Sequence, residues 1–229
     1  MIKYKNLIIV GTSHIAKESI EVVKETIESE KPDVVAIELD KKRLLALLSK
    51  KSKQKLSLKL LFKVGIAGFL FQLLGSWAER KLGKLTGVFP GSEMIEAVKK
   101  AKQIEAKVAL IDQDIEKTLK QVSKSMSIKE KIKFVLDLLK GLVKKEKIKF
   151  DLKKIPDEKT INELKEKFMK RYPNLYKVLV DKRNEHIGKN LYKLMCSFKK
   201  VVAVVGAGHE KEIISIVKEC QKQNSMQQV

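Results

Sequence analysis

Two similar segments near opposite ends of the 229-residue chain restrict its fold most strongly. Residues 7–10 and residues 201–205 are continuous aliphatic runs, mostly β-branched, which is typical of strands buried on both faces of a sheet. Each run is followed by Gly-x-x-His, so His14 and His209 occupy the same position after a strand. Glycine permits a sharp turn, and open α/β sheets bind ligands at the carboxyl ends of their strands. Because the chain has only three histidines, we predict that these two form halves of one site.

Two further aliphatic runs, at residues 34–37 and 107–111, also predict buried strands. Residues 16–31 have apolar side chains at helical spacing, so the first two strands and this helix are expected to form a right-handed βαβ unit. We therefore predict a single α/β domain with a central mixed or mostly parallel sheet and flanking helices. Helical segments packed on the sheet or inserted between its strands are expected at about residues 41–86 and 115–195.

Charged residues fall at the same predicted edge of the sheet as the histidines. Glu38 directly follows a strand, where a carboxylate either caps the next helix or belongs to the site. Glu93 lies in the first turn of a helix predicted to start at Ser92, where a carboxylate can simply compensate the helix dipole. Arg183 lies within the last long helix, and its pattern alone favours a surface ion pair. His186, on the same helix, is interpreted as lying outside the site.

Residues 41–78 contain no Asp or Glu and begin with a lysine-rich stretch. This basic stretch leads into an apolar run at residues 64–74, which is followed by Trp77. A basic flank beside an apolar helix with a tryptophan is typical of a segment that lies in an anionic membrane surface. The run of about 11 apolar residues is too short to span a bilayer. The alternative is a buried helix, or one that pairs two copies of the chain in a homodimer.

The formal net charge of +21 favours an anionic partner of some kind. No helix-turn-helix or RNA-binding motif accompanies this charge and aromatic residues make up only 6% of the chain, so nucleic-acid binding is not favoured. The two cysteines lack metal or redox spacing and are typical of reduced thiols in an intracellular protein. With no secretory signal before the first strand, we expect a cytoplasmic location, either peripheral to a membrane or anchored at it.

Six short motifs resemble, in order, those of the TraB/PrgY group of proteins, which has Tiki and GumN among its relatives. They are Gly-Thr-Ser-His at 11–14 with Ser19, Pro-Asp-Val-Val-Ala-Ile-Glu-Leu-Asp at 32–40 with Arg43, Gly-Val-Phe-Pro-Gly-Ser-Glu-Met at 87–94, Asp-Gln-Asp-Ile at 112–115, Arg-Asn at 183–184 and Val-Val-Gly-Ala-Gly-His at 204–209. Two departures stand out. The family usually has Asp-Arg-Asp where this chain has Gln113 in the middle, and many relatives continue into hydrophobic C-terminal spans.

The resemblance implies a fold similar to that of erythromycin esterase and ChaN-like proteins. Tiki relatives are described as Mn- or Co-dependent proteases, and TraB/PrgY relatives as membrane proteins that limit peptide-pheromone activity. By this resemblance His14, His209, Glu38 and Glu93 would be ligands of Mn²⁺, Co²⁺ or Zn²⁺, leaving positions open for water and substrate. The glutamate that does not bind metal would act as general base. Arg183 would hold the developing oxyanion or a substrate carboxylate.

The predicted function is therefore metal-dependent hydrolysis of peptide bonds near a membrane. One alternative is a metal-free, esterase-like hydrolase in which a histidine is the base. A second alternative is a peptide-binding or sequestering module that cleaves nothing.

Overall fold

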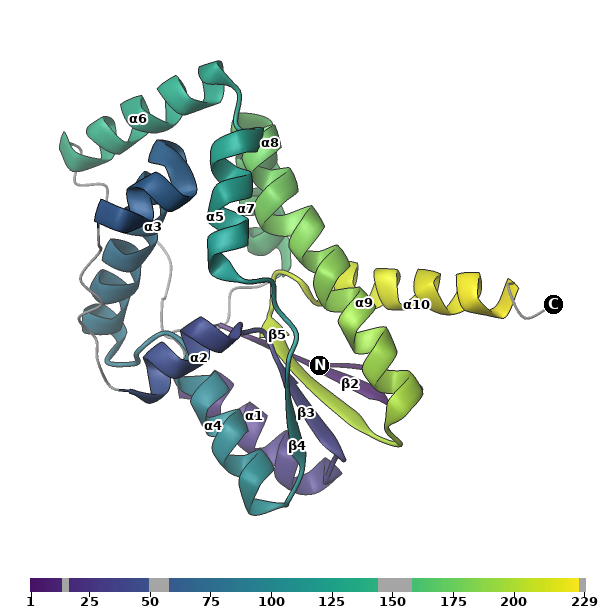
Figure 1. The fold of residues 1–229 in the computed structure, drawn as a ribbon. Helices are drawn as coiled ribbons and strands as arrows, with labels where there is room; N and C mark the ends of the chain where they lie inside the picture. The colour runs from purple at the N-terminus through teal and green to yellow at the C-terminus, as the bar shows by residue number, and fades with distance from the viewer. Residues whose placement is uncertain (14–16, 50–57, 144–157, 227–229) are drawn as a thin grey trace.

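The part of the chain that the computed structural model describes comprises residues 1–13, 17–49, 58–143 and 158–226. Within it lies one sheet of five strands, in the order β1-β2-β5-β3-β4 (Figure 1). In this order the strands are β1 (Ile2–Tyr4), β2 (Leu7–Thr12), β5 (Val201–Gly206), β3 (Val34–Ile37) and β4 (Lys107–Leu110). Strand β1 is antiparallel to its neighbour, and the other pairs are parallel. The predicted α/β class with a mixed, mostly parallel sheet is confirmed.

The four aliphatic runs identified in the sequence all form strands, but the order of these strands in the sheet was not predicted. Strand β5 lies between β2 and β3, so the unit formed by the first two predicted strands skips one position in the sheet. The register aligns Thr12 of β2 with Gly206 of β5, and the backbone N–H of Ala207 donates to the carbonyl of Thr12 at 2.9 Å. The carboxyl ends of β2 and β5, where the two Gly-x-x-His segments begin, therefore lie side by side.

Helices cover both faces of the sheet (Figure 1). One face packs on α1 (Lys17–Glu30) and α4 (Ser92–Gln103), and the other packs on α9 (Lys182–Ser197) and α10 (Glu210–Met226). Neighbouring strand residues alternate between the two apolar clusters, which explains why the strands are continuously aliphatic rather than alternately polar.

A helical region lies beyond the carboxyl ends of the parallel strands (Figure 1). Its elements are α2 (Lys41–Leu48), α3 (Leu58–Thr86), α5 (Ile115–Ser125), α6 (Ile128–Val143), α7 (Glu158–Arg171), α8 (Pro173–Tyr176) and a π-helical turn, η1 (Lys177–Asp181). A third apolar cluster holds all of these elements except α2 together, with Val122, Phe134 and Leu175 among its buried members. Helix α3 is kinked at Gly65, which has a φ of 77°.

The break between α5 and α6 was not predicted, although the sequence carries a signal for it. Ser127 and Glu130 form a capping box: the Ser127 backbone N–H donates to the Glu130 carboxylate at 2.9 Å, and the Glu130 N–H donates to the Ser127 hydroxyl at 3.2 Å. The same carboxylate accepts two hydrogen bonds from Asn174 at 2.8 Å. The capping box therefore both starts α6 and attaches it to α8.

Two glycines of α3 provide a matched test of how closely α3 and α5 approach. A Cβ atom on Gly68 would lie 2.4 Å from the backbone oxygen of Leu119, whereas one on Gly75 would meet nothing within 4 Å. We expect Gly68→Ala to lower the free energy of unfolding by about 1–3 kcal/mol, because backbone cannot move aside easily. Gly75→Ala should instead raise it by about 0.5–1 kcal/mol through helix propensity. Urea unfolding measures both, and equal effects of the two changes would contradict the close approach.

Candidate functional site

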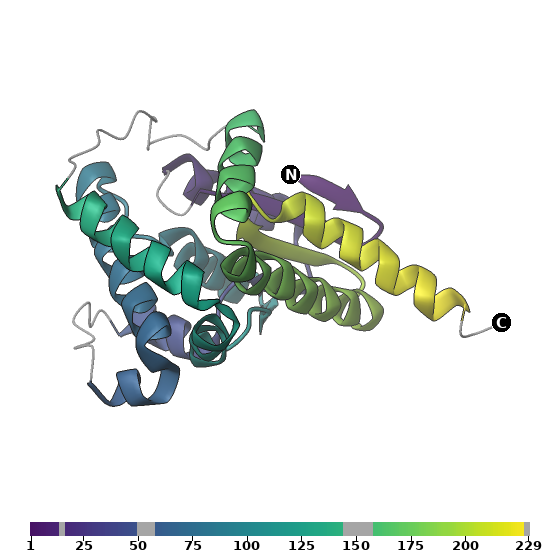
Figure 2. The same cartoon turned by 90° about the horizontal axis from the view of Figure 1, so that it is seen from above.

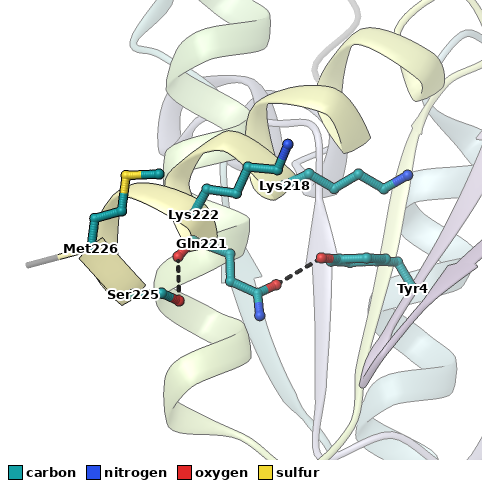
Figure 3. A pocket seen from close by; sticks show the side chains of 6 residues that line it. All are labelled: Tyr4, Lys218, Gln221, Lys222, Ser225 and Met226. Carbon is teal, nitrogen blue, oxygen red and sulfur yellow. Dashed lines mark hydrogen bonds between the residues drawn. The ribbon is translucent and has the colours of Figure 1, made fainter. Parts of the chain in front are cut away.

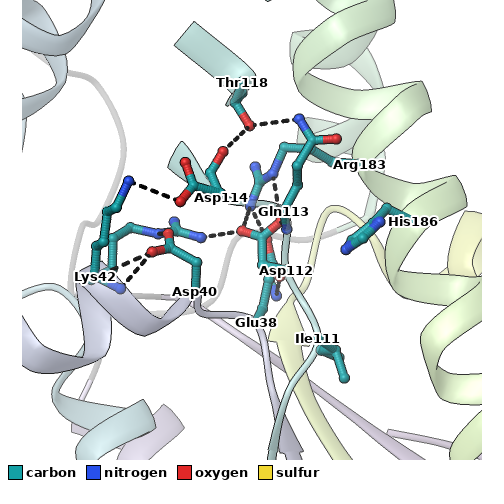
Figure 4. A network of polar contacts seen from close by, with 12 residues as sticks. Glu38, Asp40, Lys42, Ile111, Asp112, Gln113, Asp114, Thr118, Arg183 and His186 are labelled. Atoms are coloured by element: carbon teal, nitrogen blue, oxygen red, sulfur yellow. Dashed lines mark hydrogen bonds and ion pairs between the residues drawn. The ribbon is translucent and has the colours of Figure 1, made fainter. Parts of the chain in front are cut away.

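Arg183, in the first turn of α9, joins the carboxyl ends of β3 and β4 (Figure 4). Its Nη2 donates to Glu38 Oε1 at 2.7 Å and to Asp112 Oδ2 at 2.6 Å, and its Nε donates to Asp112 Oδ1 at 3.1 Å. The side chains of Glu38 and Asp112 are only 3% and 1% exposed. Arg183 thus neutralises two carboxylates that are almost completely removed from water. Arg183 therefore does not form the surface ion pair that its sequence pattern alone predicted.

A second arginine extends this network to α2. Arg43 donates to Asp112 and, through Nε, to Asp40 at 2.7 Å. Asp40 also caps α2, because its carboxylate accepts from the backbone N–H groups of Lys42 and Arg43. The helix cap is therefore Asp40 and not Glu38. The second oxygen of Glu38 instead accepts from the backbone N–H of Gly206 at 2.7 Å, which links the ends of β3 and β5.

The opposite charges of this network shift the pKa values of their partners. Burial raises the pKa of Asp112, but the charges of Arg183 and Arg43 more than offset it, so the net pKa is lowered. Burial likewise lowers the pKa of Arg183, and the carboxylates of Asp112 and Glu38 more than offset this, so its net pKa is raised. Both groups are consequently charged at neutral pH.

His209 follows the end of β5 and lies half-buried beside this network. Its Nδ1 lies 2.6 Å from Oδ1 of Asn184. An amide oxygen only accepts hydrogen bonds, so Nδ1 is the donor and the lone pair of the ring is left on Nε2. A neighbour that fixes the tautomer in this way is characteristic of histidines that bind a metal or accept a proton.

The position of His209 also changes its acidity. Burial lowers the pKa of His209; the Glu38 carboxylate acts in the opposite direction and Arg183 adds to the lowering, so the net pKa falls below its usual value. We expect NMR titration of the imidazole signals, assigned with a His209→Asn variant, to give a pKa below the ordinary 6.5. Because the folded-state pKa is lowered, folding stability falls as the pH drops from about 6.5 to that lowered pKa, since only the unfolded chain takes up the proton in this range. A measured pKa at or above 6.5 would contradict this environment.

Of the predicted site residues, Glu38, Arg183 and His209 are brought to one edge of the sheet. Glu93 lies in the first turn of α4, on the opposite face of the sheet from α9 and α10, and is only 1% exposed. Its role in the site stays a prediction. His14 lies outside the described residues.

The segment that leads to His14 is held in place by the helix that follows. The backbone N–H of Ser13 donates to the Ser19 hydroxyl at 2.9 Å, and that hydroxyl donates to the Ser13 carbonyl at 3.0 Å. Ser19 itself is completely buried. Ser19 of the first motif therefore fixes Ser13, the residue that directly follows β2.

Sequence reasoning gave no site role to Asp112, Arg43 or Asn184, although all three lie within the recognised motifs. The available signal for Asp112 was its position directly after a strand, the same signal that identified Glu38. Gln113, the departure from the usual family motif, points away from this network: its side-chain amide donates to Thr118 at 3.0 Å and to the Gln121 side chain at 3.3 Å (Figure 4). Asp112 therefore has two arginine partners, Arg43 and Arg183, without an arginine at position 113.

One surface hollow lies at this edge of the sheet, and a larger one lies at the opposite edge. A hollow of about 310 Å³ lies between α1 and the loop before α4, and Lys17, Val88 and Phe89 line it. A larger one, of about 660 Å³, is lined by Tyr4 and the last turns of α10 (Figure 3). Tyr4 pairs with Leu7, the first residue of β2, so the larger hollow lies at the amino end of the strands. It is consequently separate from Glu38 and His209.

The donors at this edge suit a divalent cation only in part. Glu38 and His209 provide oxygen and nitrogen ligands of the kinds that Mn²⁺, Co²⁺ and Zn²⁺ accept. Across residues 1–13, 17–49, 58–143 and 158–226, no three His, Cys, Asp or Glu side chains converge closely enough to hold a metal ion. His14, the other histidine predicted at this edge, lies outside these residues.

Fold and site together define an open-sheet α/β protein whose polar site lies at the carboxyl ends of its parallel strands. The family model of the TraB/PrgY/gumN family matches residues 3–225. The chain belongs to this family.

The similar proteins come from an archaeon and from mammals. An uncharacterised protein of Methanocaldococcus jannaschii is 35% identical over 227 residues, a match covering 96% of this chain and 55% of that protein. TraB domain-containing proteins of Bos taurus and Homo sapiens are each 26% identical over 88% of this chain, covering 59% and 60% of their own lengths. The chain therefore spans little more than half the length of these relatives.

Proposed function

We propose that this protein hydrolyses peptide bonds with the help of a divalent cation, and that His209 and Glu38 lie at the reacting centre. The observation that carries the proposal is the hydrogen bond from His209 Nδ1 to Asn184, which leaves Nε2 available beside an ion-paired carboxylate. His14 is the further ligand in this proposal, whereas Glu93 does not converge with Glu38 and His209 among the described residues. Mn²⁺, Co²⁺ and Zn²⁺ are the candidate ions, in line with the protease activity expected from the family resemblance.

The side chains divide the chemistry between them. When bound, the cation would lower the pKa of a water molecule and polarise the scissile carbonyl. A glutamate that does not bind the cation would accept the proton of that water. Arg183 acts as a positioning residue, because Glu38 and Asp112 engage its Nε and Nη2. It holds the Glu38 carboxylate beside Gly206 at the end of β5, rather than holding the oxyanion itself.

One alternative is favoured by the same contact. In a metal-free, esterase-like hydrolase, His209 would itself be the general base, since its tautomer is fixed and its pKa is lowered by burial. A peptide-sequestering module would use the same edge without turnover.

Chelation separates these functions. The purified full chain is analysed for bound metals and assayed with dye-labelled casein, before and after EDTA treatment and after restoring Mn²⁺, Co²⁺ or Zn²⁺ one at a time. Loss of cleavage on chelation with recovery on one added ion supports the proposal. Cleavage that EDTA leaves unchanged supports the histidine base, and saturable casein binding without products supports sequestration.

The proposed location is a membrane surface contacted through residues 41–78. Within the described residues, the stretch Lys59–Ala78 of α3 has the length and composition of a membrane-crossing helix, and 11% of it is buried in the protein. Phe62, Ile66 and Trp77 are exposed on it. The basic flank at residues 50–57 lies outside the described residues, and pairing of α3 with a second copy remains the alternative.

A further inference from the structure

Helix α6 carries an apolar face that the fold does not use. Five large aliphatic side chains with exposures between 42% and 76% lie along it: Ile128, Ile132, Val135, Leu136 and Leu139. We call this set the α6 stripe. Its members are spaced by three or four residues, so they share one side of the helix. In Figure 2, α6 crosses the side of the molecule nearest the viewer, and no other described helix covers it.

The opposite side of α6 is also apolar, and it provides the packing of the helix. Phe134 is buried against Phe71 and Tyr172, with ring centroids 6.4 and 6.1 Å apart, and Leu138 packs against the same cluster. A helix that is apolar on both sides belongs in an apolar environment on both sides. The protein packs against one side of α6. The α6 stripe on the other side has no apolar environment within the described residues.

The charges of α6 indicate what that second environment is. Both acidic residues are engaged by other groups: Glu130, which is 5% exposed, is bonded to Ser127 and Asn174, and Asp137, which is 28% exposed, to Arg171 and Tyr172. The exposed charges beside the stripe are Lys129, Lys133 and Lys140. At 100° per residue these three lysines follow one edge of the stripe. The outer face of α6 is thus apolar and purely cationic.

We propose that the outer face of α6 lies in the interface of a membrane that contains anionic lipid. The α6 stripe would contact the acyl chains while the three lysines meet the negatively charged head groups. Two copies docked through this face in a symmetric dimer would share one self-complementary patch, and its charges are all of one sign. The lipid surface complements both properties of the face. This binding surface does not depend on the proposed hydrolysis, and it adds a second contact to the membrane location proposed through residues 41–78.

Vesicle binding by the full chain tests the proposal. The probes are vesicles of phosphatidylcholine alone and of phosphatidylcholine with an equal part of phosphatidylglycerol. We expect cosedimentation with the mixed vesicles, weakened by salt. Both I132Q/L139Q and K129E/K133E/K140E should weaken the binding at least tenfold, because each reverses or removes several contacts worth roughly a few-fold to tenfold apiece.

Matched variants elsewhere on the surface control for composition and charge. L164Q/M169Q on α7 removes two aliphatic side chains of similar exposure, 46% and 45%. K193E/K199E/K222E makes the same change in formal charge at exposed positions on or beside α9 and α10. Both controls should bind within about twofold of the unchanged chain. Circular dichroism checks that every variant is folded.

Three outcomes would overturn the proposal: no binding by the unchanged chain, equal losses in stripe and control variants, or undiminished binding when α6 is altered. Sedimentation velocity covers the remaining possibility. A dimer that I132Q/L139Q dissociates, in a chain that ignores vesicles, would assign the stripe to a second copy instead. Casein cleavage without vesicles is measured in parallel, so failure of the proposed hydrolysis is seen separately from failure of lipid binding.

Discussion

Replacing Arg183 with methionine is expected to lower the free energy of unfolding by about 3–5 kcal/mol. The change removes one positive charge but leaves Glu38 and Asp112, whose side chains are at most 3% exposed, without their main partner. Uncompensated buried carboxylates are far more costly than the ion pair is stabilising. Urea unfolding at neutral pH gives the free energy directly.

Arg43→Met is the matched control, because Arg43 also pairs with Asp112 but its side chain is 32% exposed. In that variant Asp112 keeps Arg183, and the buried Asp40 keeps the two backbone N–H groups that it caps, so the loss should be smaller, about 1–2 kcal/mol. If Arg183→Met cost no more than Arg43→Met, the network at the strand ends would not be the buried, mutually dependent unit described above. A rise in pH should not rescue Arg183→Met, since higher pH keeps both carboxylates ionised.

Replacing His209 with alanine is expected to lower kcat/KM for casein peptides by roughly 100- to 10,000-fold. The variant removes the ring nitrogen that Asn184 orients, while Glu38 keeps its bonds to Arg183 and Gly206. Stability should therefore change little compared with activity. Steady-state kinetics and urea unfolding on the same preparation separate the two effects.

The third histidine provides the control for His209. His186 lies on α9, one turn beyond Arg183, and its Nε2 contacts the side chain of Asn190 at 3.1 Å. His186→Ala should retain activity within about twofold. A His209→Ala variant that kept more than a tenth of the activity would place the reacting group elsewhere, and a comparable loss in His186→Ala would show that the effect is not specific to the strand end.

Much of the fold could be predicted because buried parallel strands have a strong local pattern. The aliphatic runs gave four strands correctly. The three-residue strand β1 (Ile2–Tyr4) is too short and too polar to show such a pattern. The order of strands was not predictable in the same way, because the position of β5 between β2 and β3 depends on contacts between residues far apart in the chain.

The sequence was enough to predict which edge of the sheet holds the site, but not which side chains pair with one another there. Glu38 and His209 follow strands, so their convergence could be expected from parallel strand ends. The carboxylate partners of Arg183 could not be expected in this way, because they depend on how α9 is placed over that edge. The alternatives for Glu38 also needed the structure, since Asp40, only two residues away, was an equally good helix cap in sequence.

The central position of β5 has a consequence for how the protein is made. This strand is the last of the five described strands to leave the ribosome, yet β2 and β3 pair with it and not with each other. Until it arrives, both nascent strands expose unpaired backbone edges, and Glu38 has no Gly206 to bond. Synthesis must therefore reach β5 before Glu38 can meet Gly206, and a chain released before that strand would lack this contact and be prone to aggregate.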